Sequence, residues 1–110
     1  MNEQNYSDAQ LQELKSRIVE NLRTVYDPEI PVNIYDLGLI YAIELDAMGN
    51  ADITMTLTSP MCPVAETLPL DVETRAEAAE GVGEVNVNLV WEPQWTMDMM
   101  SEDAKLELGF

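Results

Sequence analysis

The amino-acid sequence predicts an α/β protein of the α+β two-layer sandwich type, in which two helices cover one face of a three-stranded mixed sheet. Three observations carry this prediction. Apolar residues recur at helical spacing in two segments, they alternate with polar residues in three others, and one helical segment separates the second strand from the third. The expected order is helix, hairpin, helix and strand, followed by a C-terminal helical tail. The 110 residues are expected to form one domain, 1–110.

The first helix is expected to begin at Ser7 or Asp8, since either side chain can accept a hydrogen bond from a free N–H group of the first turn. It should stop near Tyr26, because Pro28 disfavours helical geometry at the residue before it. The apolar residues expected to share one face of this helix are Leu11, Leu14, Ile18, Leu22 and Val25.

A β-hairpin is expected next, because the hydrophobic period changes to two from Leu39 onward. Its turn falls at 47–50, where Gly49 can adopt a positive φ. The side chains expected to share the buried face are Leu39, Tyr41, Ile43 and Leu45 on the first strand and Ile53, Met55 and Leu57 on the second.

The second helix is expected to run roughly from Pro63 to Glu80, where apolar residues return to helical spacing. Pro69 leaves two alternatives open, because a proline inside a helix removes a hydrogen bond. Either the helix kinks at Pro69, or its regular part begins near Thr67. Renewed alternation over 84–92 predicts the third strand.

The C-terminal tail is rich in large apolar side chains, which include Trp95 and the methionines within 97–100. These side chains are expected to form a flap over the open edge or face of the sheet, because exposed apolar patches are costly. Ser101 is then expected to begin a short helix that ends at Gly109.

The charge balance excludes several classes of function. Twenty-one acidic residues face five basic ones, for a net charge of −16, and the chain has no histidine. Phosphate backbones and anionic membrane surfaces attract clustered Lys and Arg, so neither nucleic acid nor membrane is an expected partner. The lack of histidine excludes catalytic and metal sites that need an imidazole from this chain.

The expected location is the cytoplasm. No apolar run approaches the roughly 20 residues of a membrane-spanning helix, and the first residues show no signal-peptide pattern. A single cysteine rules out a disulfide within the chain.

That cysteine, Cys62, is the candidate functional group. It lies between Pro60 and Pro63, where the strand pattern changes to a helical one. Pro63 suits the first turn of a helix, so Cys62 is expected at or just before a helix N-terminus, which favours the thiolate. A thiolate binds soft metals and attacks electrophiles. The alternative, that Cys62 is only a small buried apolar residue, stays open from placement alone.

Acidic residues near two prolines are the next candidates. Two prolines within 28–31 stiffen the connection after the first helix and hold Asp27 and Glu29 in defined directions, although Asp27 can equally close a local turn and Glu29 can face solvent. Asp36 lies among apolar residues, where an aspartate most often caps a turn that leads into the next strand.

Several of these segments, taken together, resemble the SufT/PaaD-type domain family, whose members are described as metal–sulfur cluster assembly or maturation factors. The resemblance runs from about residue 12 to Phe110. The segments that carry it are Asp27–Glu29, Ile34–Ile40, Thr58–Pro63, Gly81–Val87 and Trp91–Trp95. The chain lacks the additional cysteines of the phenylacetate-oxygenase branch, so the resemblance implies general maturation rather than that specialised role.

The resemblance implies a small α/β fold and a role in delivering iron–sulfur clusters to client proteins. It makes Cys62 the functional thiol. The residues it implies as supporting groups are Asp27, Glu29, Asp36, Thr58 and Pro63. Clusters are normally held by four thiolates, so one cysteine per chain implies either a cluster or iron shared between the subunits of a homodimer, or a thiol that only contacts a partner.

The first hypothesis is therefore a non-enzymatic maturation factor that transiently binds iron or an iron–sulfur cluster through Cys62. Its partners would be the iron–sulfur assembly machinery and client proteins. The alternative is an adaptor that binds no metal and docks through the apolar tail around Trp95 and 97–100. A thiol enzyme is the weakest alternative, because a carboxylate such as Asp27 would have to replace histidine as the base.

Overall fold

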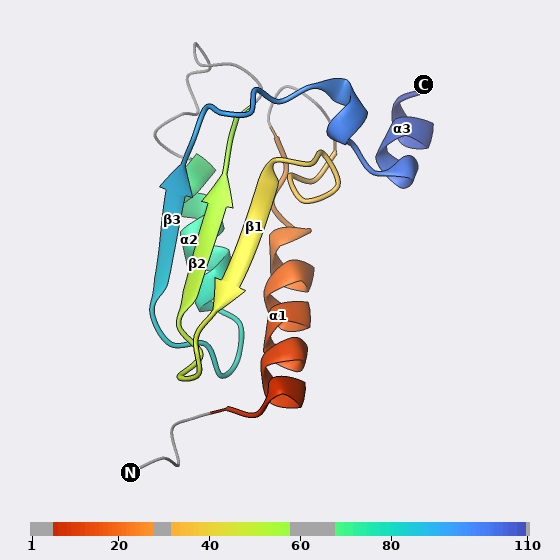
Figure 1. Ribbon diagram of the computed structural model, residues 1–110. Helices are drawn as coiled ribbons and strands as arrows, with labels where there is room; N and C mark the ends of the chain where they lie inside the picture. The colour runs from red at the N-terminus through yellow and green to blue at the C-terminus, as the bar shows by residue number, and fades with distance from the viewer. Residues whose placement is uncertain (1–5, 28–31, 58–67, 110) are drawn as a thin grey trace.

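Two helices lie against one face of a three-stranded sheet in the computed structural model, which describes residues 6–27, 32–57 and 68–109 (Figure 1). The sheet order is β1-β2-β3, with β1 antiparallel and β3 parallel to β2. The elements are α1 (Asp8–Leu22), β1 (Ile40–Leu45), β2 (Ala51–Met55), α2 (Leu68–Glu77), β3 (Val85–Leu89), the 3₁₀ helix η2 (Met97–Met99) and α3 (Glu102–Leu108). The predicted α+β architecture with a mixed sheet is confirmed. None of the helices within these ranges is long and apolar enough to cross a membrane.

Helix α1 begins where the sequence predicts but ends about one turn earlier. Ser7 caps it: the Gln10 N–H donates to the Ser7 hydroxyl at 3.2 Å, and the Ser7 N–H donates to the Gln10 side chain at 2.8 Å. The helix stops at Leu22 because the Thr24 hydroxyl donates to the Asn21 carbonyl at 2.6 Å and closes a turn there.

The first strand of the hairpin departs from strict alternation. The pairing register between β1 and β2 shifts between Ile40 and Ala42, which is a β-bulge. A bulge inserts an unpaired residue and re-aims its neighbours. Tyr41, predicted to share the buried face, instead donates its hydroxyl to the Pro93 carbonyl at 2.7 Å.

Helix α2 starts at Leu68 within the described residues, and Pro69 occupies its first turn. The residues that would distinguish a kink at Pro69 from a regular start near Thr67 precede Leu68, so both alternatives stay predictions. The predicted start at Pro63 lies outside the described residues.

Both α2 and β3 end earlier than predicted. Helix α2 stops at Glu77 rather than Glu80, because hydrogen bonds to the third residue back tighten the next turn and Gly81 takes a φ of 97°. Strand β3 spans Val85–Leu89 rather than 84–92, because β2 ends opposite its last residue.

The core lies between the sheet and the two long helices. The apolar spacing seen in the sequence identifies most of it, although Leu11, Tyr41 and Leu45 are only partly buried. Burying each side chain of this size stabilises the fold by about 1.5–3 kcal/mol. Side chains with no exposed surface include Ile18 and Leu22 of α1, Ile53 and Met55 of β2, and Val72 of α2.

The C-terminal tail crosses the turn at 33–39 that precedes β1. The Trp95 indole N–H donates to the Leu37 carbonyl at 2.7 Å. The Ser101 N–H donates to the Asp36 carbonyl at 2.8 Å. The tail therefore holds this turn in place. The predicted flap over the edge or face of the sheet covers mainly the turn before β1.

The last helix forms where the sequence predicts it. The Ala104 N–H donates to the Ser101 hydroxyl at 3.1 Å, and Gly109 ends α3 with a φ of 86°. The methionines before it divide between two environments: Met100 is buried, whereas Met97 is 54% exposed. The flap is thus only partly packed.

Replacing Gly38 with alanine should destabilise the protein by about 2–4 kcal/mol. Gly38 has a φ of 86°, and an added Cβ would overlap the Met99 carbonyl oxygen. Urea unfolding measures the loss. Gly109→Ala is the matched control, because Gly109 has the same φ of 86° but no atom within 4 Å of the added Cβ. Equal losses in the two variants would contradict close packing of the tail on the turn.

Candidate functional site

The connection between β2 and α2 contains the predicted thiol. The described chain reaches Leu57, which is buried, and resumes at Leu68, the first residue of α2. The predicted site residues that lie outside the described ranges are Glu29, Thr58, Cys62 and Pro63. Their roles stay predictions, whereas Asp27 and Asp36 are described.

Two connections start from the same end of the molecule. Helix α1 and strand β2 both run toward the end opposite the hairpin turn at 46–50 (Figure 1). The chain that leaves α1 toward Asp27 and the chain that leaves β2 toward Cys62 therefore begin at this shared end. The topology is compatible with the predicted proximity of these two segments.

Asp27 is held in a short antiparallel pairing after α1. Its N–H donates to the Val32 carbonyl at 3.4 Å, and the Ile34 N–H donates to the Val25 carbonyl at 2.8 Å. Asp27 is only 4% exposed. Burial of a carboxylate is costly unless other groups compensate for it. Asp27 is therefore packed inside the fold and does not lie in a solvent-exposed turn.

Asp36 is tied into the turn at 33–39 by its side chain and its backbone. The Asn33 amide donates to the Asp36 carboxylate at 2.9 Å, and the Asp36 N–H donates back to the Asn33 side-chain oxygen at 2.8 Å. The Arg23 guanidinium lies 3.7 Å from the other carboxylate oxygen. Each carboxylate oxygen of Asp36 therefore has a donor, one from Asn33 and one from Arg23. In this structure Asp36 orders the turn.

Arg23 connects the end of α1 with the same turn. Its guanidinium carbon lies 5.2 Å from the centre of the Tyr35 ring, a cation–π distance. This contact and the ion pair with Asp36 together orient the guanidinium. The Arg23 side chain is nevertheless 52% exposed.

A pair of hydroxyl groups lies under the tail at the end of β2. Burial raises the pKa of the Tyr41 phenol above its ordinary value of 10.0, and a hydrogen bond with the Thr56 side chain works in the opposite direction. Thr56 is 1% exposed, and its hydroxyl has no partner of regular hydrogen-bond geometry among the described residues. The Tyr41 phenol is therefore a polar neighbour of this buried hydroxyl.

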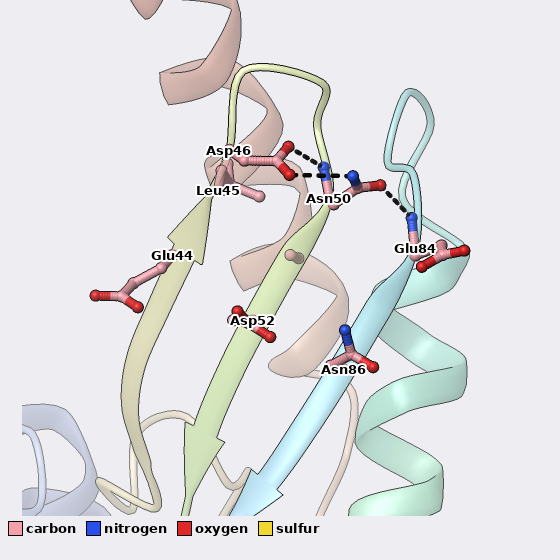
Figure 2. A pocket seen from close by; sticks show the side chains of 8 residues that line it. Glu44, Leu45, Asp46, Asn50, Asp52, Glu84 and Asn86 are labelled. Atoms are coloured by element: carbon pink, nitrogen blue, oxygen red, sulfur yellow. Dashed lines mark hydrogen bonds between the residues drawn. The ribbon is translucent and has the colours of Figure 1, made fainter.

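An acidic hollow of about 300 Å³ opens on the exposed face of the sheet, beside the hairpin turn (Figure 2). Glu44, Asp52 and Asn86 stand in a row there because they are paired across the three strands. This is the opposite end of the sheet from the Cys62 connection. Within the described ranges no three acidic side chains form a group that could hold a metal ion, and we assign no ligand to this hollow.

Asp46 at the rim of this hollow stabilises the hairpin turn. Its carboxylate accepts from the Asn50 N–H and side chain at 3.0 Å each and from the Met48 N–H at 2.9 Å. The hydrogen bonds, above all that of the Asn50 backbone, hold the pKa of Asp46 below its usual range. The Asn50 side-chain oxygen then accepts from the Glu84 N–H at 2.8 Å and links the turn to β3 (Figure 2).

The partners of the turn at 33–39 were not anticipated from the sequence. Only the contact with Asn33 could have been predicted from the local sequence, because an Asn three residues before an Asp is typical of a turn capped by a side chain. Arg23 and Ser101 reach Asp36 only through the tertiary fold.

The variant Tyr41→Phe should destabilise the protein by about 1 kcal/mol at neutral pH, because the Pro93 carbonyl loses its donor. The folded state raises the pKa of Tyr41, so the neutral phenol stabilises it fully below pH 10.0 and less as the pH rises through the folded-state pKa. The difference between wild type and variant in urea unfolding should accordingly be constant below pH 10.0 and shrink above it. A difference that grows with alkaline pH would contradict a raised pKa of Tyr41 in the folded state.

Residues 15–88 match the protein family described as iron–sulfur cluster assembly protein. An Fe-S protein maturation auxiliary factor of Porphyromonas gingivalis is 57% identical over 93 residues, which cover 84% of this chain and 89% of that protein. The Fe-S protein maturation auxiliary factor YitW of Bacillus subtilis is 43% identical over 96 residues, covering 87% of this chain and 94% of that protein.

The fold has a counterpart among solved structures. The crystal structure of a domain of unknown function, DUF59, from Bacillus anthracis superposes with a TM-score of 0.85 at 38% sequence identity. The match covers 94% of this chain and 99% of that one. The layered arrangement described above is therefore shared over almost the whole of both chains.

Proposed function

This chain belongs to the iron–sulfur cluster assembly protein family and acts in iron–sulfur assembly and maturation, and we propose that it is a non-enzymatic factor that passes iron or a cluster to client proteins through Cys62. The observation that carries the proposal is the family match over residues 15–88, because that range includes the only cysteine of the chain together with Asp27 and Asp36.

The chemistry of the single thiol supports this proposal. Thiolates are the protein ligands that iron–sulfur clusters prefer. Cys62 belongs to the connection from β2 to α2, and the chain toward Asp27 starts from the same end of the molecule (Figure 1). In the proposal, Asp27 and Glu29 support the thiol as hydrogen-bonding or metal-contacting groups, while Thr58 and Pro63 shape its segment.

The cluster or iron is transient cargo in this proposal. A cluster normally needs four thiolates, and this chain supplies one. We therefore propose that the cargo is held between two copies of the chain, with carboxylates or small external thiols completing its coordination. The reducing cytoplasm is the proposed location, since it keeps such a thiol free.

A metal-free adaptor remains the second candidate, and one observation favours it. Met97 is 54% exposed in the tail, which gives that segment an apolar side chain able to meet a partner. Trp95 and Met100 contribute less than the sequence suggests, because Trp95 donates to the Leu37 carbonyl and Met100 is buried.

The variant Cys62→Ser should fail to restore client enzymes in cells that lack the protein. Serine keeps the size of the side chain but provides no thiolate, so iron–sulfur enzyme activity should stay at the level of cells without any copy. Met97→Ala is the control that separates the two candidates. Full restoration by Cys62→Ser, with loss in Met97→Ala, would overturn the cargo role and favour the adaptor.

Anaerobic reconstitution with iron and sulfide should produce visible absorption and a dimeric mass in light scattering. Both should disappear together in Cys62→Ser, because the shared cluster joins the two chains. A colourless wild-type monomer under these conditions would contradict direct cluster binding.

A further inference from the structure

Strand β3 forms one edge of the sheet, on the side farthest from α1 (Figure 1). It pairs in parallel with β2 on its inner side. Within the part of the chain that the structure describes, no segment pairs with its outer side. An edge of this kind leaves a row of backbone N–H and C=O groups available to another chain.

The pairing with β2 determines which backbone groups of β3 face outward. The Ala51 N–H donates to the Glu84 carbonyl at 2.8 Å, just before the strand. The Val90 N–H donates to the Met55 carbonyl at 2.8 Å, just after it. In a parallel pair, alternate residues of a strand bond to the neighbouring strand, so the residues between them direct their backbone groups away from it. The residues of β3 with outward backbone groups are therefore Val85, Val87 and Leu89.

The two edges of the sheet differ in how they are protected. Native proteins block a sheet edge with bulges, charged residues, prolines or covering segments. Strand β1 has a bulge before Ala42 and a charge at Glu44, and the Tyr41 hydroxyl connects it to the tail. Strand β3, with the sequence Val-Asn-Val-Asn-Leu, has a regular register, no charge and no proline. Its edge is thus open to an additional strand.

The side of β3 that faces the helices is apolar and only partly covered. Val85 is buried, whereas Val87 and Leu89 are half-buried although they pack against the core. Trp91, which continues the same alternation, is 40% exposed. Apolar side chains of an added strand would lie beside these residues and complete their burial.

The other side of β3 belongs to the open, acidic face of the sheet. Asn86 of β3 pairs with Asp52 of β2, which pairs with Glu44 of β1 (Figure 2). Glu84 lies just before β3 and is exposed. None of the three strands contains a lysine or an arginine, and no ion pair to these carboxylates occurs among the described residues. A long basic side chain on an added strand can extend across Asn86 toward Asp52.

Charge also distinguishes between possible occupants of this edge. A second copy of the chain brings a net charge of −16, and pairing of two β3 strands would join two acidic faces into one sheet. A segment with basic residues is instead attracted by the same face. The complementary occupant is therefore an extended segment in which apolar and basic residues alternate, because successive side chains of a strand point to opposite faces.

We infer that the free edge of β3 binds such a segment of a partner protein by strand addition. Its apolar residues pack beside Val87 and Leu89, and its Lys or Arg residues face Asp52 and Glu84. Backbone hydrogen bonds supply affinity in this mode of recognition, and the alternating side chains supply specificity. The inference goes beyond the proposed function, because binding at this edge needs no thiol.

The probe is the synthetic peptide Lys-Val-Lys-Val-Lys-Val-Lys, and the reference peptide carries glutamate in place of lysine. Fluorescence anisotropy with the full chain measures affinity. The basic peptide should bind at least roughly tenfold more tightly than the acidic one. In NMR, the bound peptide should slow hydrogen exchange at the amides of Val85, Val87 and Leu89. Equal affinity of the two peptides would overturn the inference.

Two N-methylated peptides separate strand addition from attraction by charge alone. One carries methyl groups on the valine amides and the other on the lysine amides, so both keep every charge. In a strand, only one of these two sets of N–H groups faces β3. One methylated peptide should therefore lose binding, whereas the other should bind like the parent peptide. Equal behaviour of the two would overturn the inference.

The double variant Asp52→Asn/Glu84→Gln should bind the basic peptide about fivefold more weakly, as expected for the loss of two exposed ion pairs. The matched control is Glu20→Gln/Glu107→Gln, which removes the same charge from exposed positions of α1 and α3 and should bind like wild type. Equal weakening in both double variants would show attraction by net charge alone and overturn the inference.

Two further measurements concern other occupants and the thiol. A metal-free dimer in light scattering, with the same three amides protected, would assign the edge to a second copy and overturn the inference. Cys62→Ser should bind the peptide like wild type, so that failure of the cargo role leaves the edge site standing. Amide protection confined to elements other than β3 would overturn the edge site even if Cys62→Ser is inactive in cells.

Discussion

The parallel pairing of β2 with β3 is the constraint on which the rest of the molecule depends. Parallel neighbours cannot be joined by a tight turn, so the chain must return along the sheet through a crossover, here α2. The crossover leaves from the C-terminal end of β2, and the connection containing Cys62 is its first part. Because Ile53 and Met55 of β2 are fully buried, this starting point is anchored in the hydrophobic core.

The turn at 33–39 depends on contacts from two other parts of the chain, the end of α1 and the C-terminal tail. Arg23 approaches it from α1, and the tail meets it through Trp95 and Ser101. These contacts satisfy backbone carbonyls and one carboxylate that would otherwise be costly to bury. The tail is therefore part of the frame around this turn rather than an appendage.

The acidic character of the chain has different consequences in different places. On the exposed face of the sheet, Glu44 and Asp52 form part of an open acidic surface, while Asp46 is used to hold the hairpin turn. On α1, helical spacing gathers Lys15 and Arg23 beside Tyr35.

The sequence by itself determined the order of elements, the core and the resemblance through which Cys62 was selected, because hydrophobic period and capping residues such as Ser7 and Ser101 act locally. The end of β3, the bulge before Ala42 and the contacts of Arg23 and Ser101 with Asp36 were decided only by the tertiary structure. Their physical cause is long-range pairing: a strand ends where its neighbour ends, and a half-buried carboxylate takes the donors that the fold brings to it.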